Sequence, residues 1–141
     1  MRHNRADFKN FIRQIALGLP MVLASTLCMA ADWKLIERFS DIEMFYDAES
    51  IKRNRDIVTV KTLVNCFKVR NRGEGDFRSK TTLQIVDCKN EKVLPKFSSD
   101  YREHFAKGGV VDEGLVDASQ VDAKPNSVAG VIHAVVCNLS I

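Results

Sequence analysis

The sequence has no long uninterrupted apolar run, no internal repeat and no low-complexity tract. It also lacks a glycine motif of the kind that cradles phosphate, and it has no carboxylate pair at a spacing typical of acid–base catalysis. The chain has 141 residues, of which 45% are hydrophobic and 28% charged, and this composition argues against disorder and against a multi-span membrane protein. We therefore expect one folded domain that is not an enzyme.

The apolar run that does occur is short and lies near the amino terminus, within residues 15–27. Basic residues precede this run, and small residues follow it at positions 28–31. This order predicts a signal peptide over residues 1–30 and a mature domain over residues 31–141 that begins at Ala31. A retained membrane anchor is one alternative, although the run is interrupted and too short for a good spanning helix. A lipid anchor at Cys28 is another, and Leu27 disfavours it because lipoprotein signals have a small residue there.

Little net charge remains once this leader is set aside. The full chain has 21 Lys and Arg against 18 Asp and Glu, and residues 1–30 hold four of the basic and one of the acidic residues. The mature part therefore has 17 of each sign. Nothing in this balance predicts binding to nucleic acid.

Alternating apolar residues predict an antiparallel sheet of about five to six strands. We expect these strands at residues 33–39, 42–47, 57–69, 77–88, 93–99 and 110–111. Gly73 and Gly75 mark the turn of a long hairpin between the third and fourth strands. Pro95 should place the fifth strand at an edge or a bulge. Residues 48–56 are predicted as a loop or a one-turn helix, residues 100–107 as an extension or a short helical turn, and residues 113–124 as a loop.

A helix is expected near the carboxyl terminus. Pro125-Asn126-Ser127 is a good helix start, and Val128, Val131, Ile132 and Val135 form an apolar stripe that should pack on the sheet. Cys137 would end the helix, and Asn138 would stop it. The predicted fold class is therefore α+β, an antiparallel sheet with one helix packed on it.

Three cysteines remain in the mature chain, namely Cys66, Cys88 and Cys137. A hairpin that turns around residues 73–75 would place Cys66 opposite a residue near Leu83, which is too far from Cys88 for a disulfide. The two remaining possible disulfides are Cys88–Cys137 and Cys66–Cys137. The parity of the third strand also changes after Asn65, which predicts either a bulge or a strand that is covered on both faces.

The order of several short motifs resembles the surface-adhesin protein E-like domains of Gram-negative bacteria. The matching elements are Trp33, Phe45-Tyr46-Asp47, Ser50-Ile51, Arg78-Ser79, Asp87-Cys88, Gly109-Val110-Val111, Pro125, Ser127 and Val136-Cys137. They cover nearly all of residues 32–138. Two features depart from the family: Val121 and Ala123 occupy a region where a Trp is expected, and Cys66 stands where an aromatic residue is more usual.

The resemblance implies a Cys88–Cys137 disulfide and no catalytic apparatus, with Cys66 left as a buried thiol. It also implies an exported binding domain without a cofactor, either a surface adhesin for host or matrix proteins or a periplasmic accessory protein of the envelope. Members of the family include an outer-surface adhesin that forms dimers, so a homodimer is a further expectation. No transmembrane span is expected after processing.

One cluster of basic residues is a candidate binding site. Lys68, Arg70, Arg72, Arg78 and Lys80 gather around the predicted hairpin turn. They could bind an anionic ligand such as a glycosaminoglycan, lipopolysaccharide or an acidic protein. The alternative is a solvated hairpin tip kept soluble by charge, and Glu74 and Asp76 in the same loop favour it.

Two other arrangements are weaker. His133 and Cys137 are four residues apart on the helix and could share a metal, but a disulfide at Cys137 would remove that ligand. Cys66 with His104 or His133 could form a nucleophile and base, although Cys66 falls on an apolar strand face. We therefore predict no metal site and no catalytic residue.

Overall fold

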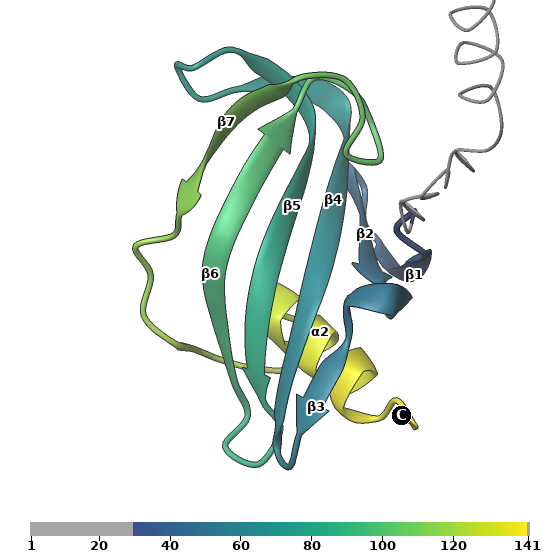
Figure 1. The fold of residues 1–141 in the computed structure, drawn as a ribbon, viewed down its shortest axis with the longest axis vertical. Coiled ribbons are helices and arrows are strands. Elements are labelled where there is room, and N and C mark those ends of the chain that lie inside the picture. The colour runs from purple at the N-terminus through teal and green to yellow at the C-terminus, as the bar shows by residue number, and fades with distance from the viewer. Residues whose placement is uncertain (1–29, 141) are drawn as a thin grey trace, which may run out of the picture.

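The computed structural model describes residues 30–140, which form one twisted antiparallel sheet and one helix (Figure 1). The predicted leader, with Cys28 and its processing site, therefore lies almost wholly outside the described residues. The helix α2 spans Val128–Cys137, and a short 3-10 turn, η2, spans Ala48–Ser50. Between residues 30 and 140 no helix is long and apolar enough to cross a membrane. The strands are β1 Trp33–Arg38, β2 Ile42–Asp47, β3 Lys52–Asn54, β4 Ile57–Asn71, β5 Asp76–Asp87, β6 Lys92–Tyr101, β7 Val110–Leu115 and β8 Val121–Asp122.

The sheet has the order β1-β2-β4-β5-β6-β7, so chain neighbours are mostly sheet neighbours. The short strands β3 and β8 pair with the remaining edges of β4 and β6. The predicted class, an antiparallel sheet with a carboxyl-terminal helix, is confirmed, but the sheet has eight strands. The segments of β3 and β8 were predicted as loops, because each strand has only two or three residues and no alternating apolar pattern.

A bulge in β4 controls the register of the central hairpin. Residues 57–65 pair with residues 79–87, but beyond the bulge Arg70 lies opposite Phe77. Four residues of β4, 66–69, therefore stand against one residue of β5. The predicted placement of Cys66 opposite Leu83 is wrong, because these extra residues shift the register and Leu83 pairs with Lys61.

Of the two explanations for the parity change after Asn65, the bulge is correct. Phe67 and Val69 are each 45% exposed, so this part of β4 is not covered on both faces. A second bulge lies in β6, where Gln84 pairs with Pro95 and Leu83 pairs with Phe97. Pro95 therefore sits at a bulge, as predicted, at the point where β8 gives way to β7 along the same edge.

The core lies between α2 and one face of the sheet. Its buried residues are Met44, Val58, Val60, Val86, Val93, Ile132 and Val136. Ser127 caps α2, since its Oγ accepts a hydrogen bond from the Gly130 amide at 3.0 Å. Gly130 is needed there, because a Cβ atom would lie 2.0 Å from the Lys124 carbonyl oxygen.

The buried face of α2 differs from the predicted stripe. Ile132 and Val136 are buried, whereas Val128 is 52% exposed. The helix is apolar around most of its circumference, so periodicity alone does not determine its rotation. The close approach of Gly130 to Lys124 and the covalent bond at Cys137 determine the rotation instead.

The Cys88–Cys137 disulfide is present, with 5.6 Å between the two Cα atoms, and this confirms the predicted pairing. Cys66 is a buried free thiol. The Arg53 guanidinium donates to the carbonyl oxygens of Val136 at 3.2 Å and Cys137 at 3.3 Å, which satisfies acceptors that the helix end leaves free. A covalent bond and a cation thus hold the last turn of α2 on the sheet.

Substitution of Cys137 by Ser should lower the free energy of unfolding by about 2–4 kcal/mol, because the disulfide closes a long loop. Cys66→Ser is the matched control, and it should cost about 1–3 kcal/mol through a buried hydroxyl rather than through chain entropy. Denaturant unfolding with and without reductant separates the two effects. Reductant should destabilise the Cys66→Ser variant and leave the Cys137→Ser variant unchanged; the opposite pattern would contradict the assignment.

Candidate functional site: a hollow on the helix-free face

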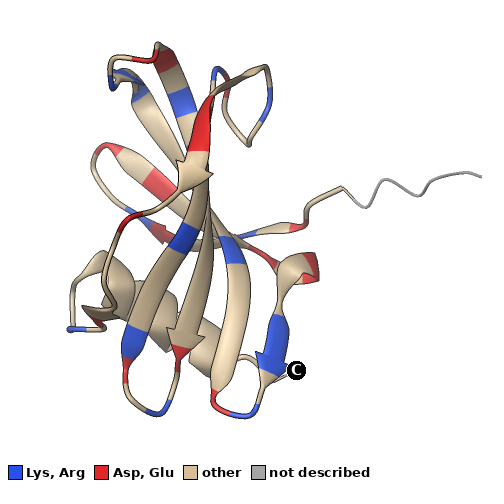
Figure 2. Cartoon of the chain, turned by 60° about the vertical axis from the view of Figure 1, so that its left-hand side comes forward, with Lys and Arg blue, Asp and Glu red and all other residues tan. Residues whose placement is uncertain are grey.

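The two faces of the sheet are covered differently. Helix α2 packs behind the lower half of the sheet, and the face toward the viewer in Figure 1 carries no helix. A loop of residues 102–109, which we call the cover loop, connects β6 to β7 and folds over the upper part of this open face (Figure 1). Charged residues lie both at the turns and along the strands, whereas α2 carries none (Figure 2).

Side chains of four neighbouring strands form a row across the open face. Lys61 pairs with Leu83, Leu83 with Phe97, and Phe97 with Leu115. Leu83 is 36% exposed, Phe97 37% and Leu115 84%. Residues that pair directly in a sheet point to the same side, so these apolar side chains lie together in solvent.

Side chains of the sheet hold the cover loop in place. The Phe105 amide donates to Asn65 Oδ1 at 2.9 Å, and the Ala106 amide donates to Ser79 Oγ at 3.1 Å. Ser79 Oγ in turn donates to the Glu103 carbonyl at 2.5 Å. Asn65 and Ser79 are buried, so these bonds are shielded from water and replace the hydrogen bonds that the loop would otherwise make with solvent.

The cover loop also has an unusual backbone. Phe105 and Ala106 have φ angles of 57° and 56°, in the left-handed region that residues with a Cβ rarely adopt. Aromatic packing supports this conformation, since the Phe105 and Phe45 rings are 5.3 Å apart at an interplanar angle of 58°. Such conformations persist where the surroundings over-determine them, and they are frequent at functional sites.

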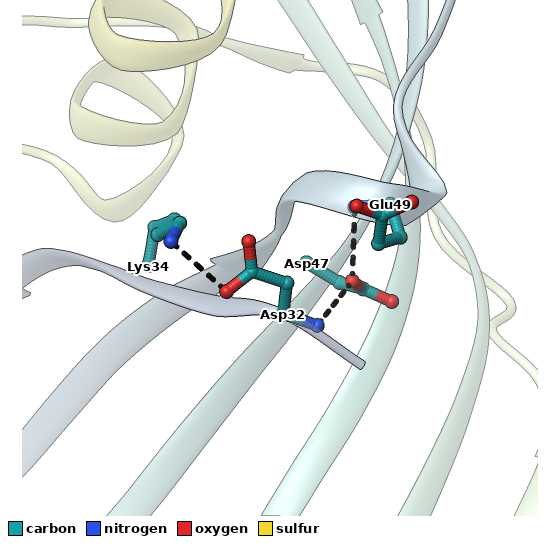
Figure 3. A network of polar contacts seen from close by, with 4 residues as sticks. All are labelled: Asp32, Lys34, Asp47 and Glu49. Carbon is teal, nitrogen blue, oxygen red and sulfur yellow. Dashed lines mark hydrogen bonds and ion pairs between the residues drawn. The ribbon is translucent and has the colours of Figure 1, made fainter. Parts of the chain in front are cut away.

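A second set of polar contacts holds the chain at the start of β1 (Figure 3). Asp47 Oδ1 accepts from the Asp32 amide at 3.0 Å and from the Glu49 amide at 3.2 Å. Lys34 pairs with Asp32 at 3.0 Å, and this hydrogen bond and charge raise the pKa of Lys34. The buried Asp47 carboxylate thereby joins β1, the end of β2 and η2 into one unit.

Between these two anchored segments lies a hollow of about 560 Å³, which we call the aromatic hollow. Its volume is in the range of small-ligand sites, about 300–1,000 Å³. It is lined by Ala30, Ala31, Trp33, Lys61, Thr81, Tyr101, Phe105, Ala106 and Lys107. A neighbouring hollow of about 450 Å³ shares Phe105 and Lys107 with it and adds Arg78, Glu103 and His104.

The aromatic hollow has a positive lining. Lys61 and Lys107 are exposed, and none of the ion pairs found among residues 30–140 includes either of them. No Asp or Glu lines this hollow. Two Lys residues and three aromatic residues therefore line the same hollow, and no ion pair among the described residues neutralises either Lys.

The structure divides the predicted basic cluster. Arg70 pairs with Asp41 at 2.5 Å, and Lys80 lies 3.4 Å from Oδ1 of the buried Asp100, so carboxylates already neutralise both. The Arg72 guanidinium lies 5.8 Å from the centre of the Phe77 ring. Lys68 and Arg78 are exposed, and no ion pair among the described residues includes them. Anion binding at the hairpin tip stays a prediction, which now depends on Lys68, Arg72 and Arg78.

Cys66 is placed as a structural thiol. Burial raises its pKa above the ordinary value, and the nearby Arg70 only partly opposes this. His104 Nε2 contacts the Cys66 carbonyl oxygen at 2.9 Å, and His133 Nε2 lies 3.3 Å from the Cys88 carbonyl. Cys137 is oxidised, and residues 30–140 contain no group of three metal-ligating side chains.

Sequence reasoning missed the aromatic hollow. Trp33, Lys61, Tyr101 and Lys107 lie on three strands and one loop, and only the fold brings them together. The one signal available was the segment Asp100–Lys107, in which aromatic and charged residues mix without strand or helix periodicity.

These observations define a small disulfide-linked α+β domain with one covered and one open sheet face. Comparison with known proteins gives the family. The surface-adhesin protein E family matches residues 33–138, and the chain belongs to it. The resemblance seen in the sequence is thereby confirmed.

Solved structures share the fold. Crystal form II of Haemophilus influenzae protein E is similar with a TM-score of 0.54 and 17% identity, covering 72% of this chain and 91% of that one. Protein E from non-typeable Haemophilus influenzae has a TM-score of 0.55 and 18% identity, covering 86% of this chain and 81% of that one. No curated protein sequence matches the chain.

The anchoring of the cover loop can be tested at Ser79. Replacement by Ala removes one acceptor and one donor from a buried site and should destabilise the domain by about 1–3 kcal/mol. Amide exchange at residues 103–107 should become faster than in the parent. Ser98→Ala, in the adjacent strand β6, is the control and should change neither quantity. Unchanged exchange in the Ser79 variant would show that its hydroxyl does not hold the loop.

The hairpin-tip prediction is tested by replacing Lys68, Arg72 and Arg78 together with Ala. If the tip binds anions, binding to lipopolysaccharide should weaken, and the loss should be larger at low salt because exposed charges are screened. Arg70→Ala is the matched control, since Asp41 already pairs with that side chain. Equal binding by the parent and the triple variant would leave only a solvated tip.

Proposed function

We propose that the chain is an exported, non-enzymatic binding domain that acts as a surface adhesin for host or matrix proteins. Membership of the surface-adhesin protein E family supports this proposal. The same membership supports an outer-surface location and export through the leader predicted at residues 1–30. The alternative is a periplasmic accessory protein of the envelope that has no host ligand.

One observation carries the binding function, namely the exposed row of Leu83, Phe97 and Leu115 on the open face. Contiguous apolar side chains in solvent are typical of interaction surfaces. The strands that carry Leu83 and Phe97 are paired on both sides, so the row is held rigidly before a partner arrives. A rigid surface loses little conformational entropy on binding, which favours affinity.

The row can be tested by replacing Leu83 and Phe97 with Lys. Binding of the purified protein to surfaces coated with extracellular-matrix or serum proteins should fall by about tenfold or more, because buried apolar anchors dominate interface energies. The control is the pair Val121→Lys and Val128→Lys; both residues are also half-exposed, but Val128 is the first residue of α2 and Val121 lies in β8 near it. Equal loss in both variants would point to a non-specific charge effect.

Protease accessibility on intact cells separates the two functions. A surface adhesin should be cleaved on intact cells, whereas a periplasmic accessory protein should be cleaved only after the outer membrane is opened. Full protection on intact cells would therefore overturn the adhesin proposal and leave the accessory function.

A further inference from the structure

The aromatic hollow has a lining that matches one class of ligand. Trp33, Tyr101 and Phe105 line it with aromatic side chains, and Phe105 is 41% exposed. Lys61 and Lys107 supply two unpaired ammonium groups at the same hollow, among the residues described here. The face of a sugar ring is a set of C–H groups that stack on aromatic rings, and an acidic substituent would pair with the ammonium groups.

We propose that the aromatic hollow is a binding site for an acidic saccharide, a sugar chain that carries carboxylate or sulfate groups. The rings would take the apolar face of a sugar unit, and Lys61 and Lys107 would take its acidic groups. Tyr101, which is only partly buried, also carries a hydroxyl group that could bond to the hydroxyls of the sugar, whereas Thr81 is buried. This site goes beyond the protein-docking row and does not depend on it.

The position of the hollow favours a saccharide over a peptide. Extended peptides bind sheets by adding a strand to a free edge. The floor of the aromatic hollow consists of Lys61, Thr81 and Tyr101 on β4, β5 and β6. These strands are all paired on both sides, so no row of free backbone groups is offered to a peptide.

The hollow is also built before a ligand arrives. The cover loop is held by Asn65 and Ser79, and its left-handed residues Phe105 and Ala106 place one ring and one ammonium group at the hollow. On the opposite wall, Asp47 fixes the chain next to Trp33 through the Asp32 amide (Figure 3). Both walls are therefore held by buried polar side chains of the sheet.

The neighbouring hollow extends the site along the cover loop. Phe105 and Lys107 line both hollows, so a sugar chain that lies across them would meet a third cation, Arg78. Glu103 lines this second hollow as well and opposes an anion there. The acidic group nearest Lys61 and Lys107 should therefore contribute more to binding than one placed at Arg78.

Trp33 gives a direct readout, because it is the only Trp in the chain and it lines the aromatic hollow. The exported protein is titrated with a sulfated hexasaccharide derived from heparin and with a hyaluronan hexasaccharide, which carries carboxylates only. We expect a saturable change in Trp33 fluorescence with at least one of the two hexasaccharides. Comparison of the two shows whether the site binds sulfate or carboxylate groups. A neutral maltohexaose should cause no change.

Lys61→Gln combined with Lys107→Gln should raise the dissociation constant by about tenfold or more, because two charge-assisted contacts are lost. Lys52→Gln combined with Lys89→Gln is the matched control; it removes the same charge from exposed positions at the other end of the sheet and should leave binding within about twofold.

Three results would overturn the proposal. They are the absence of a saturable signal with either acidic hexasaccharide, equal binding by the parent and the Lys61–Lys107 variant, and equally tight binding of a polyglutamate peptide at the same site. The adhesin proposal is tested separately, by the matrix-protein and intact-cell measurements. The variant with Leu83 and Phe97 replaced keeps Lys61 and Lys107, so the two proposals can fail independently.

Discussion

The attachment of α2 to one face of the sheet is the constraint on which the rest of the structure depends. The Cys88–Cys137 bond joins the end of the helix to the end of β5, and Ile132 and Val136 complete the core beneath it. A ten-residue helix would be marginal by itself, because nucleation is costly and few bonds repay it. Covalent attachment, the Ser127 cap and the Arg53 contacts together make it a permanent cover.

Covering one face leaves the other free for ligands. On that face the sheet is not simply exposed, because the cover loop is bound to it by Asn65 and Ser79. Polar side chains that point away from the helix would usually be solvated, but here they are buried and serve the loop backbone. The domain therefore has a buried layer on each side of the sheet. The layer under α2 is apolar, and the layer under the cover loop combines the hydrogen bonds of Asn65 and Ser79 with the packing of Phe45 against Phe105.

The open face combines two kinds of surface within a short distance. Lys61 lines the aromatic hollow and also pairs with Leu83, the first apolar member of the exposed row. A sugar chain in the hollow and a protein on the row would thus meet at the same strand. Glycosylated matrix proteins offer both kinds of group, so the two proposals describe surfaces that one ligand could contact together.

The sequence by itself determined six of the eight strands, the hairpin turn at Gly73 and Gly75, the helix start at Ser127 and the family, because these depend on local periodicity and on short motifs. It did not determine the register of β4 against β5, since the parity change after Asn65 indicates a bulge but not how many residues the bulge contains. It also left the rotation of α2 open, because that helix is apolar nearly all round. Only the tertiary structure shows that Asp41 and Asp100 neutralise Arg70 and Lys80. It alone also brings Trp33, Lys61 and Lys107 together at one hollow. Contacts between such distant segments follow from sheet order and loop placement rather than from local sequence.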